Sequence, residues 1–136
     1  MKNDDCIFCK IANGEIPTRT VYEDDDFCAI MDFKPATKGH ILLLPKQHAD
    51  DLFGLPEDIA SKVLPTAKKI ALKMQKNLQF DGMNLVQNNG EIAGQTILHF
   101  HLHMIPRYIN DGQKIAWVPT SPEDAELDRI KDQIVG

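Results

Sequence analysis

The stretch His99-Phe100-His101-Leu102-His103-Met104-Ile105 places three of the chain's five histidines within five residues. Side chains alternate between the two faces of a β-strand, so these three histidines are expected to share one face. The other face would carry an apolar set suited to a hydrophobic core: Leu98, Phe100, Leu102 and Met104. We therefore predict a strand over residues 98–105, ended by Pro106, with neighbouring imidazoles roughly 7 Å apart.

Three imidazoles on one face are hard to explain as packing, and two functional interpretations remain. One is a metal site, because His-x-His in a strand can chelate zinc. The other is nucleophilic catalysis by imidazole. Gly94-Gln95-Thr96 comes just before the strand and offers backbone and side-chain donors for a phosphate. A hydrolytic zinc site more usually adds a carboxylate base, and none is adjacent, so the flanks favour attack on phosphorus.

The rest of the chain alternates short strand patterns with one long helical pattern. Apolar spacing and breakers predict helices over 6–12, 57–79 and from about Pro122, and strands over 21–22, 27–31, 41–44 and 84–87. Pro65 is expected to kink or divide the long helix. Antiparallel strands with one main helix indicate an α+β fold, and 136 residues fit a single domain over residues 1–136.

Charge and composition exclude several partners. Residues 1–32 hold eight acids against three bases, whereas residues 33–136 hold twelve of each, so the net charge of −5 lies at the N-terminal end. No basic patch is present for a long nucleic acid, although a small nucleotide is not excluded. The longest apolar run, Ile41–Leu44, is far short of the roughly 20 residues of a membrane span. No export signal and three cysteines indicate a reducing, cytoplasmic location without a disulfide.

The histidine run resembles the His-φ-His-φ-His-φ-φ motif of the histidine triad superfamily, in which φ is apolar. Gly94-Gln95-Thr96 is similar to that family's Gly-Gln-Ser/Thr. Further similarities follow in matching order: Ile7-Phe8, Glu15-Ile16-Pro17, Asp32, Gly39-His40, Pro45-Lys46-Gln47-His48 and Asn88. The resemblance covers about residues 4–108 and is strongest to the nucleotide-binding branch. It implies a five-stranded antiparallel sheet with one long helix and a short N-terminal helix, and a twofold dimer with a ten-stranded sheet. The tail, residues 109–136, is expected near the site or the dimer interface.

The same resemblance implies an activity and its residues. The enzyme would hydrolyse purine nucleoside phosphoramidates or acyl-adenylates at the α-phosphorus, through a covalent nucleotidyl-histidine. His101 would attack, His103 would contact the phosphate, and Gln95 and Thr96 would hold the phosphate and leaving group. The nucleotide would be bound by Asp32 at the ribose, Asn88 at phosphate or ribose, and a base slot of Ile7, Phe8, Ile16, Ile30 and Phe33. The alternatives are a dinucleoside polyphosphate hydrolase and a regulatory nucleotide-binding module with incidental hydrolysis.

Cys6-Ile7-Phe8-Cys9 forms a C-x-x-C pair. A thioredoxin-type redox role would need a preceding strand, and nothing upstream can form one. A zinc site needs two more ligands, which His48 and His99 could supply to give a closed, structural tetrahedral site. Some bacterial members of the family bind zinc in this pattern. His99 would then be a metal ligand, and the chemistry would need no metal. Two free cysteines in a packed helix remain the alternative. His40 suits a structural role as well as a hydrogen bond near the site.

Overall fold

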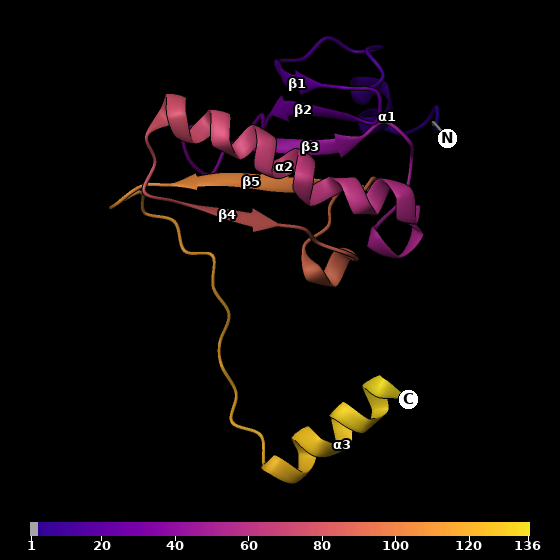
Figure 1. Cartoon of the computed structure of the whole chain (residues 1–136), viewed down its shortest axis with the longest axis vertical. Helices are drawn as coiled ribbons and strands as arrows, with labels where there is room; N and C mark the ends of the chain where they lie inside the picture. Colours follow the sequence, from indigo (N-terminus) through magenta and orange to yellow (C-terminus); the bar gives the residue numbers. More distant parts are fainter. Residues whose placement is uncertain (1–2) are drawn as a thin grey trace.

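The computed structural model describes residues 3–136 and has the expected α+β architecture. Five antiparallel strands form one sheet in the order β1-β2-β3-β5-β4. Helix α2 crosses one face of this sheet (Figure 1), and the short helix α1 packs against the other face. The strands are β1 (Thr20–Glu23), β2 (Phe27–Met31), β3 (Ile41–Pro45), β4 (Gly82–Val86) and β5 (Leu102–Arg107). The helices are α1 (Ile7–Ala12), α2 (Glu57–Leu78) and α3 (Asp124–Val135), with 3-10 turns η1 (Leu52–Gly54) and η2 (Glu91–Ala93).

Each face of the sheet has its own hydrophobic cluster. The larger cluster lies under α2 and includes Phe100, Leu102 and Met104. The smaller one lies under α1 and is built from Phe8, Ala12, Cys28, Ile30, Leu42 and Leu44. The predicted alternation is therefore confirmed for the apolar side, which leaves the histidines for the α1 face. Leu98 is an exception: its side chain is 62% exposed, so its assignment to the core was wrong.

The boundaries of the histidine strand differ from the prediction. β5 covers Leu102–Arg107 rather than residues 98–105, so only His103 of the three histidines lies in it. The backbone before Leu102 forms its hydrogen bonds outside the β3–β5 ladder: the Phe100 N–H donates to the carbonyl of Ala49 at 2.7 Å. At its other end the strand continues through Pro106. Its ladder with β3 has already ended at Met104, so the missing N–H of proline breaks no bond on that side.

Helix α2 is one continuous element across Pro65, so the expected division does not occur. A residue at position 65 would normally donate its N–H to the carbonyl of Ser61. Both positions are exposed, and water can satisfy that carbonyl without breaking the helix. The other predicted elements are confirmed with shifted ends. The strand predicted at 84–87 begins at Gly82, and Cys6 caps the first helix instead of belonging to it.

The C-terminal segment leaves the body of the domain. Its first residues are held there by two side chains: Tyr108 donates to the Lys38 carbonyl at 2.8 Å, and Gln113 donates to the Ala36 carbonyl at 2.9 Å. The chain then runs without regular structure to α3, which lies apart from the sheet, beyond β4 (Figure 1). Trp117, in the middle of this segment, is 84% exposed. Within residues 3–136, no helix has the length and apolar character to cross a membrane.

Candidate active site and metal centre

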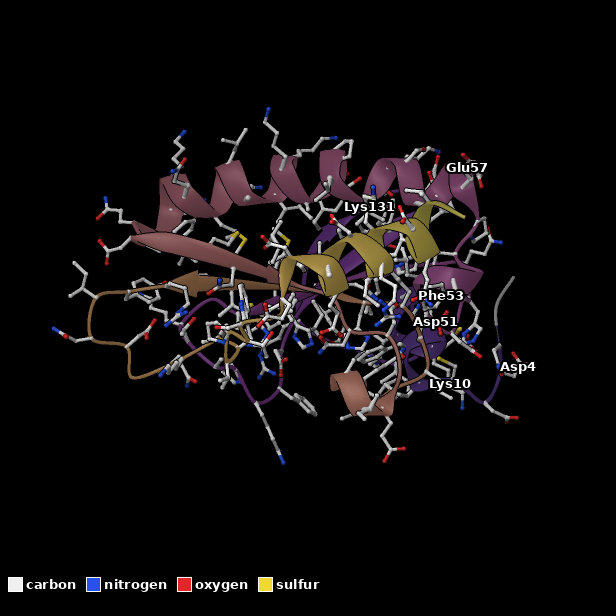
Figure 2. The ribbon with its side chains drawn as sticks, turned by 90° about the horizontal axis from the view of Figure 1, so that it is seen from below. Asp4, Lys10, Asp51, Phe53, Glu57 and Lys131 are labelled. Carbon is white, nitrogen blue, oxygen red and sulfur yellow. The ribbon has the colours of Figure 1, made fainter. Side chains whose placement is uncertain are left out.

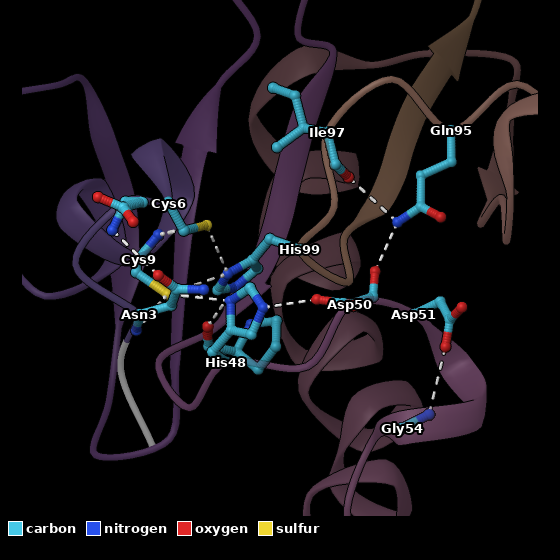
Figure 3. A network of polar contacts seen from close by, with 12 residues as sticks. Asn3, Cys6, Cys9, His48, Asp50, Asp51, Gly54, Gln95, Ile97 and His99 are labelled. Carbon is cyan, nitrogen blue, oxygen red and sulfur yellow. Dashed lines mark hydrogen bonds and ion pairs between the residues drawn. The ribbon is translucent and has the colours of Figure 1, made fainter.

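Four predicted ligands meet on the α1 face of the sheet. Cys6 and Cys9 come from the N-cap and first turn of α1, His48 follows β3, and His99 precedes β5. The Nδ1 atom of His99 lies 3.4 Å from each of the two sulfurs, and the Nδ1 atom of His48 lies 3.2 Å from Cys9 Sγ (Figure 3). All four ligand atoms lie within 4.8 Å of one another. The structure thus gathers residues that are up to 93 positions apart in sequence.

The donor set fits a tetrahedral zinc ion. Zn–S bonds of about 2.3 Å and Zn–N bonds of about 2.0 Å place sulfur and nitrogen roughly 3.5 Å apart, close to the distances between these atoms. Each imidazole also has its other nitrogen engaged. His99 Nε2 donates to the Pro45 carbonyl at 2.9 Å and His48 Nε2 to Asp50 Oδ1 at 2.8 Å, which leaves both Nδ1 atoms as ligands. Burial lowers the pKa of His99 to about 4, so this imidazole is neutral and able to coordinate.

His101 is buried beside this cluster and has a defined tautomer. Its Nδ1 donates to the carbonyl of His99 at 2.7 Å, so the lone pair is on Nε2. The edge of the Phe8 ring packs 5.1 Å from the His101 ring, centroid to centroid. The His103 ring lies at the same distance on another side. His101 therefore combines a fixed orientation with a free nucleophilic nitrogen.

His103 belongs to a second hydrogen-bonded group with His40 and Asp32. The Ala36 N–H donates to His40 Nδ1 at 2.9 Å, so neutral His40 keeps its proton on Nε2. That nitrogen faces His103 Nδ1 at 3.0 Å and Asp32 Oδ2 at 3.4 Å. The proton of His103 is then on Nε2. Burial lowers the pKa of His40 and takes that of His103 to about 4, so both rings are neutral.

This second group brings three ligand atoms within 4.8 Å of one another, but it is a hydrogen-bonded relay. A histidine that coordinates a metal through one nitrogen normally donates a proton from the other. His40 Nδ1 accepts a hydrogen bond instead, so its Nε2 carries the proton and has no lone pair for a cation. Of the two roles open to His40, the structure supports a hydrogen bond at the site.

In the Gly94-Gln95-Thr96 loop, the Gln95 side chain is buried and the Thr96 side chain is exposed. Gln95 is buried, and its amide is fully engaged: Nε2 donates to the carbonyls of Asp50 and Ile97, and Oε1 accepts from the Gly90 N–H. It therefore braces the loop against the metal centre (Figure 3). Thr96 is exposed on a cleft of about 380 Å³ lined also by Cys6, His48 and Asp50. Gly94 has φ +102°, and a Cβ there would meet the Asn88 side chain at 3.2 Å.

The residues predicted for nucleotide binding are only partly brought together. Phe8 and Ile30 share the hydrophobic cluster under α1, and Phe8 contacts both His99 and His101. Phe33 is 90% exposed, and Ile7 is 51% exposed. Ile16 is half-buried after α1. Asp32 caps a turn by accepting the Lys34 N–H at 2.8 Å through Oδ1, while Oδ2 faces His40.

Sequence reasoning missed three supporting residues. Asp50 orients His48, and the spacing His48-x-Asp50 was a usable signal because metal-bound histidines commonly donate to a carboxylate. The Ala36 N–H sets the tautomer of His40. Gln113 in turn holds the Ala36 carbonyl. No local sequence pattern predicts the contacts of Ala36 and Gln113, because they depend on how residues 107–113 fold back onto the domain.

The fold and the site define a class of protein: an antiparallel α+β domain with an imidazole cluster on one face of its sheet. The HIT domain model matches residues 13–110. A HIT-like protein of Methanocaldococcus jannaschii is 42% identical over 131 residues, which are 96% of this chain and 99% of that protein. The adenosine 5′-monophosphoramidase of Candida albicans is 34% identical over 134 residues, covering 95% of this chain and 88% of that enzyme. The chain belongs to the HIT family, whose histidine triad motif it contains.

Solved structures agree with this assignment. A crystal structure of a protein from Streptococcus mutans superposes with a TM-score of 0.94 at 39% identity, over 98% of this chain and 85% of that one. A zinc-bound histidine triad family protein from Mycobacterium smegmatis superposes with a TM-score of 0.76 at 34% identity, over 94% and 96% of the two chains. The second structure shows that a protein with this fold binds zinc.

Proposed function

We propose that this protein is a hydrolase that cleaves purine nucleoside phosphoramidates or acyl-adenylates at the α-phosphorus and releases a nucleoside monophosphate. The hydrogen bond from His101 Nδ1 to the His99 carbonyl is the observation that carries the proposal, because it leaves Nε2 as a nucleophile. Relatives named as adenosine 5′-monophosphoramidase support the substrate class.

The reaction has two displacement steps. His101 Nε2 attacks the α-phosphorus, forming an N–P bond while the bond to the leaving group breaks. A carboxylate departs as the anion, whereas an amine departs after taking a proton from solvent. Water then attacks the same phosphorus and loses a proton to solvent, and the N–P bond breaks to release the nucleotide and His101 with its proton still on Nδ1. His103, with its proton on Nε2, is positioned beside His101 to donate to a phosphate oxygen as charge develops. Asp32 and His40 keep that proton in place by fixing the tautomer of His103.

We further propose that Cys6, Cys9, His48 and His99 hold a structural zinc ion. Zinc would supply a cross-link between α1, the end of β3 and the histidine segment. The His99 side chain then serves this centre, while its carbonyl orients His101. One residue thus links the metal centre to the nucleophile, and the chemistry proceeds at His101 without a metal.

The proposed nucleotide site lies on the α1 face, beside the histidines. Phe8 and Ile30 belong to the buried apolar cluster on this face and would form the floor of the slot for a purine ring, and Ile7, Ile16 and Phe33 would complete it. Asp32 would accept hydrogen bonds from the ribose hydroxyls through its partly exposed carboxylate, whose oxygens also contact the Lys34 N–H and His40. Thr96 and the backbone of its loop would contact the phosphate, with Asn88 next to Gly94. The buried amide of Gln95 would act by holding this loop.

The test compares hydrolysis of an adenosine phosphoramidate and of diadenosine tetraphosphate by the wild type and His101→Ala. We expect phosphoramidate turnover in the wild type and a loss of at least about a thousandfold in the variant, roughly 4 kcal/mol in the barrier. Binding of AMP, measured by calorimetry, should survive. Near-wild-type turnover by His101→Ala would refute the mechanism. Preference for the tetraphosphate would move the protein to the dinucleoside polyphosphate hydrolases, and AMP binding without turnover would favour a regulatory module.

A further inference from the structure

A groove opens beside α2, on the face of the sheet opposite to the histidines. It lies between the C-terminal half of α2 and the adjoining ends of β1, β2 and β3, with a volume of about 360 Å³. Figure 2 shows α2 and the sheet as two layers with side chains between them, and the groove lies at this level. The depression on the other side of α2, toward β4, has a separate lining that includes Met83 and Leu85.

The walls of the groove are aliphatic or thioether side chains. They are built by Val21, Met31, Ile41, Ile70, Met74 and Leu78. Ile41, Ile70 and Met74 are buried and belong to the core, whereas Val21 is 44% exposed. In the part of the chain that the structure describes, no aromatic side chain lines the groove. Because methionine adapts its shape to an apolar neighbour, these walls suit a flexible aliphatic chain.

The polar groups at the rim of the groove are cationic or neutral. Lys38, Lys73 and Asn77 line it with exposed side chains. Within residues 3–136 neither lysine amine has an ion-pair partner, and no carboxylate lines the groove. Lys69, one turn before Lys73 on α2, differs because its amine lies over the Tyr22 ring at 5.7 Å. Two unpaired cations at one entrance favour an anionic group there.

The size of the groove limits the length of the chain that it can hold. At about 30 Å³ for each non-hydrogen group, the share of one water molecule in the liquid, 360 Å³ holds about twelve such groups. Decanoate has about this size. Small-molecule sites of this kind enclose an apolar body and fix its orientation with a few polar groups.

We propose that the groove binds a medium-chain alkyl carboxylate, with its chain along the aliphatic walls and its carboxylate at Lys38 and Lys73. The two ammonium groups donate charge-assisted hydrogen bonds to the carboxylate, and the Asn77 amide offers a further donor at the same rim. This site is separate from the proposed hydrolase centre, because the sheet lies between α2 and the histidines.

The test titrates hexanoate, octanoate, decanoate and tetradecanoate, below their micelle-forming concentrations, into the full-length protein with isotope-labelled methionine and isoleucine methyl groups. The methyl signals of Met31, Met74 and Ile70 should shift together, whereas that of Met83, on the β4 side of α2, should not shift. Affinity should rise about two- to fourfold for each methylene up to decanoate, the upper value applying to complete burial. It should then level off, because further methylenes extend into water.

The role of the lysines is tested with the octanoate and octanol pair and with charge variants. Octanoate should bind the wild type more tightly than octanol does. Lys38→Gln and Lys73→Gln should each weaken octanoate binding about two- to fivefold, as expected for a solvent-exposed ion pair, and leave octanol binding unchanged. Lys76→Gln is the matched control: it removes the same charge from α2 outside the groove, and it should bind octanoate as the wild type does.

The opposite results would overturn the proposal. Absence of shifts at Met31 and Met74 would show that the groove takes no such ligand. Equal shifts at Met83, or affinity that keeps rising to tetradecanoate, would mean adsorption on apolar surface without a defined site. Octanol binding as tight as octanoate binding, or equal losses in Lys73→Gln and Lys76→Gln, would remove the carboxylate from its assigned position. None of these readouts depends on turnover, so they are independent of the proposed hydrolase activity.

Discussion

Lowering the pH should destabilise this protein through His103. Burial, with His101 and His40 close by, takes the pKa of His103 to about 4 in the folded state, against 6.5 for an exposed histidine. The unfolded chain therefore binds a proton below pH 6.5 that the folded chain does not bind until about pH 4. Because the unfolded state holds more protons in this window, stability falls as the pH falls. Above pH 7 this contribution is constant.

The size of the effect follows from the two pKa values. Between pH 7.5 and pH 4.5 a single group with this difference costs about 2 kcal/mol of unfolding free energy, since solvent screens a half-buried ring. Protonated His103 also loses its acceptor at Nδ1, which His40 Nε2 contacts at 3.0 Å. Protonation therefore removes a hydrogen bond and places two donors face to face.

Guanidinium unfolding of the wild type and His103→Asn at both pH values isolates this contribution. Asparagine can accept from His40 through its side-chain oxygen, but it does not titrate. The wild type should lose about 2 kcal/mol more than the variant on acidification, since the other histidines titrate in both proteins. Equal losses of unfolding free energy in the two proteins would mean that folded His103 takes up a proton as readily as the unfolded chain does. The assignment of neutral His103 and His40 rings, joined by a hydrogen bond, would then be wrong.

Two further predictions concern the supporting contacts. Asp50→Ala should weaken zinc binding about 10–100-fold in a chelator competition titration, because His48 loses its carboxylate partner. Asp51→Ala, whose carboxylate caps η1 instead, should bind zinc normally, and equal affinities in the two variants would contradict the assigned role of Asp50. Gln113→Ala should lower kcat about fivefold with little change in KM, because Ala36 and so His40 lose a hydrogen bond of about 1 kcal/mol. A rise in KM with unchanged kcat, or the same loss in the neighbouring Lys114→Ala, would refute this positioning role.

The histidine segment shows how far alternation alone can be trusted. Period-two spacing separated the apolar side of residues 100–104 from the histidine side, and the core under α2 confirms it. It could not locate the start of β5, because Phe100 bonds to Ala49 and His99 to Ile97 before the ladder begins. The first of these bonds depends on the β3–η1 connection, which lies about fifty residues earlier. Likewise, the exposure of Leu98 reflects the loop that carries His99 into the cysteine cluster.

The candidate metal ligands could be predicted from sequence, whereas the tautomers could not. Residue chemistry together with the family resemblance predicted Cys6, Cys9, His48 and His99 as a ligand set, and the structure brings these four side chains together. The protonation pattern needed coordinates. From sequence, the Gln95 side-chain amide was expected to be available to a phosphate. Only the fold shows that it is already hydrogen-bonded to the backbone of Asp50, Ile97 and Gly90.

The two roles proposed for the histidine run fit a backbone that joins the sheet only after His101. In a regular strand the backbone carbonyls point sideways toward the neighbouring strands, whereas side chains stand above and below the sheet, so the His99 carbonyl would not face a side chain two residues later. Because residues 97–101 lie outside β5, that carbonyl accepts from His101 Nδ1 at 2.7 Å while the His99 ring reaches the cysteines. Displacing His99 should therefore disturb the nucleophile through one peptide group. The irregular backbone that the alternation rule failed to predict is the part of the chain that joins the proposed zinc ligands to the proposed nucleophile.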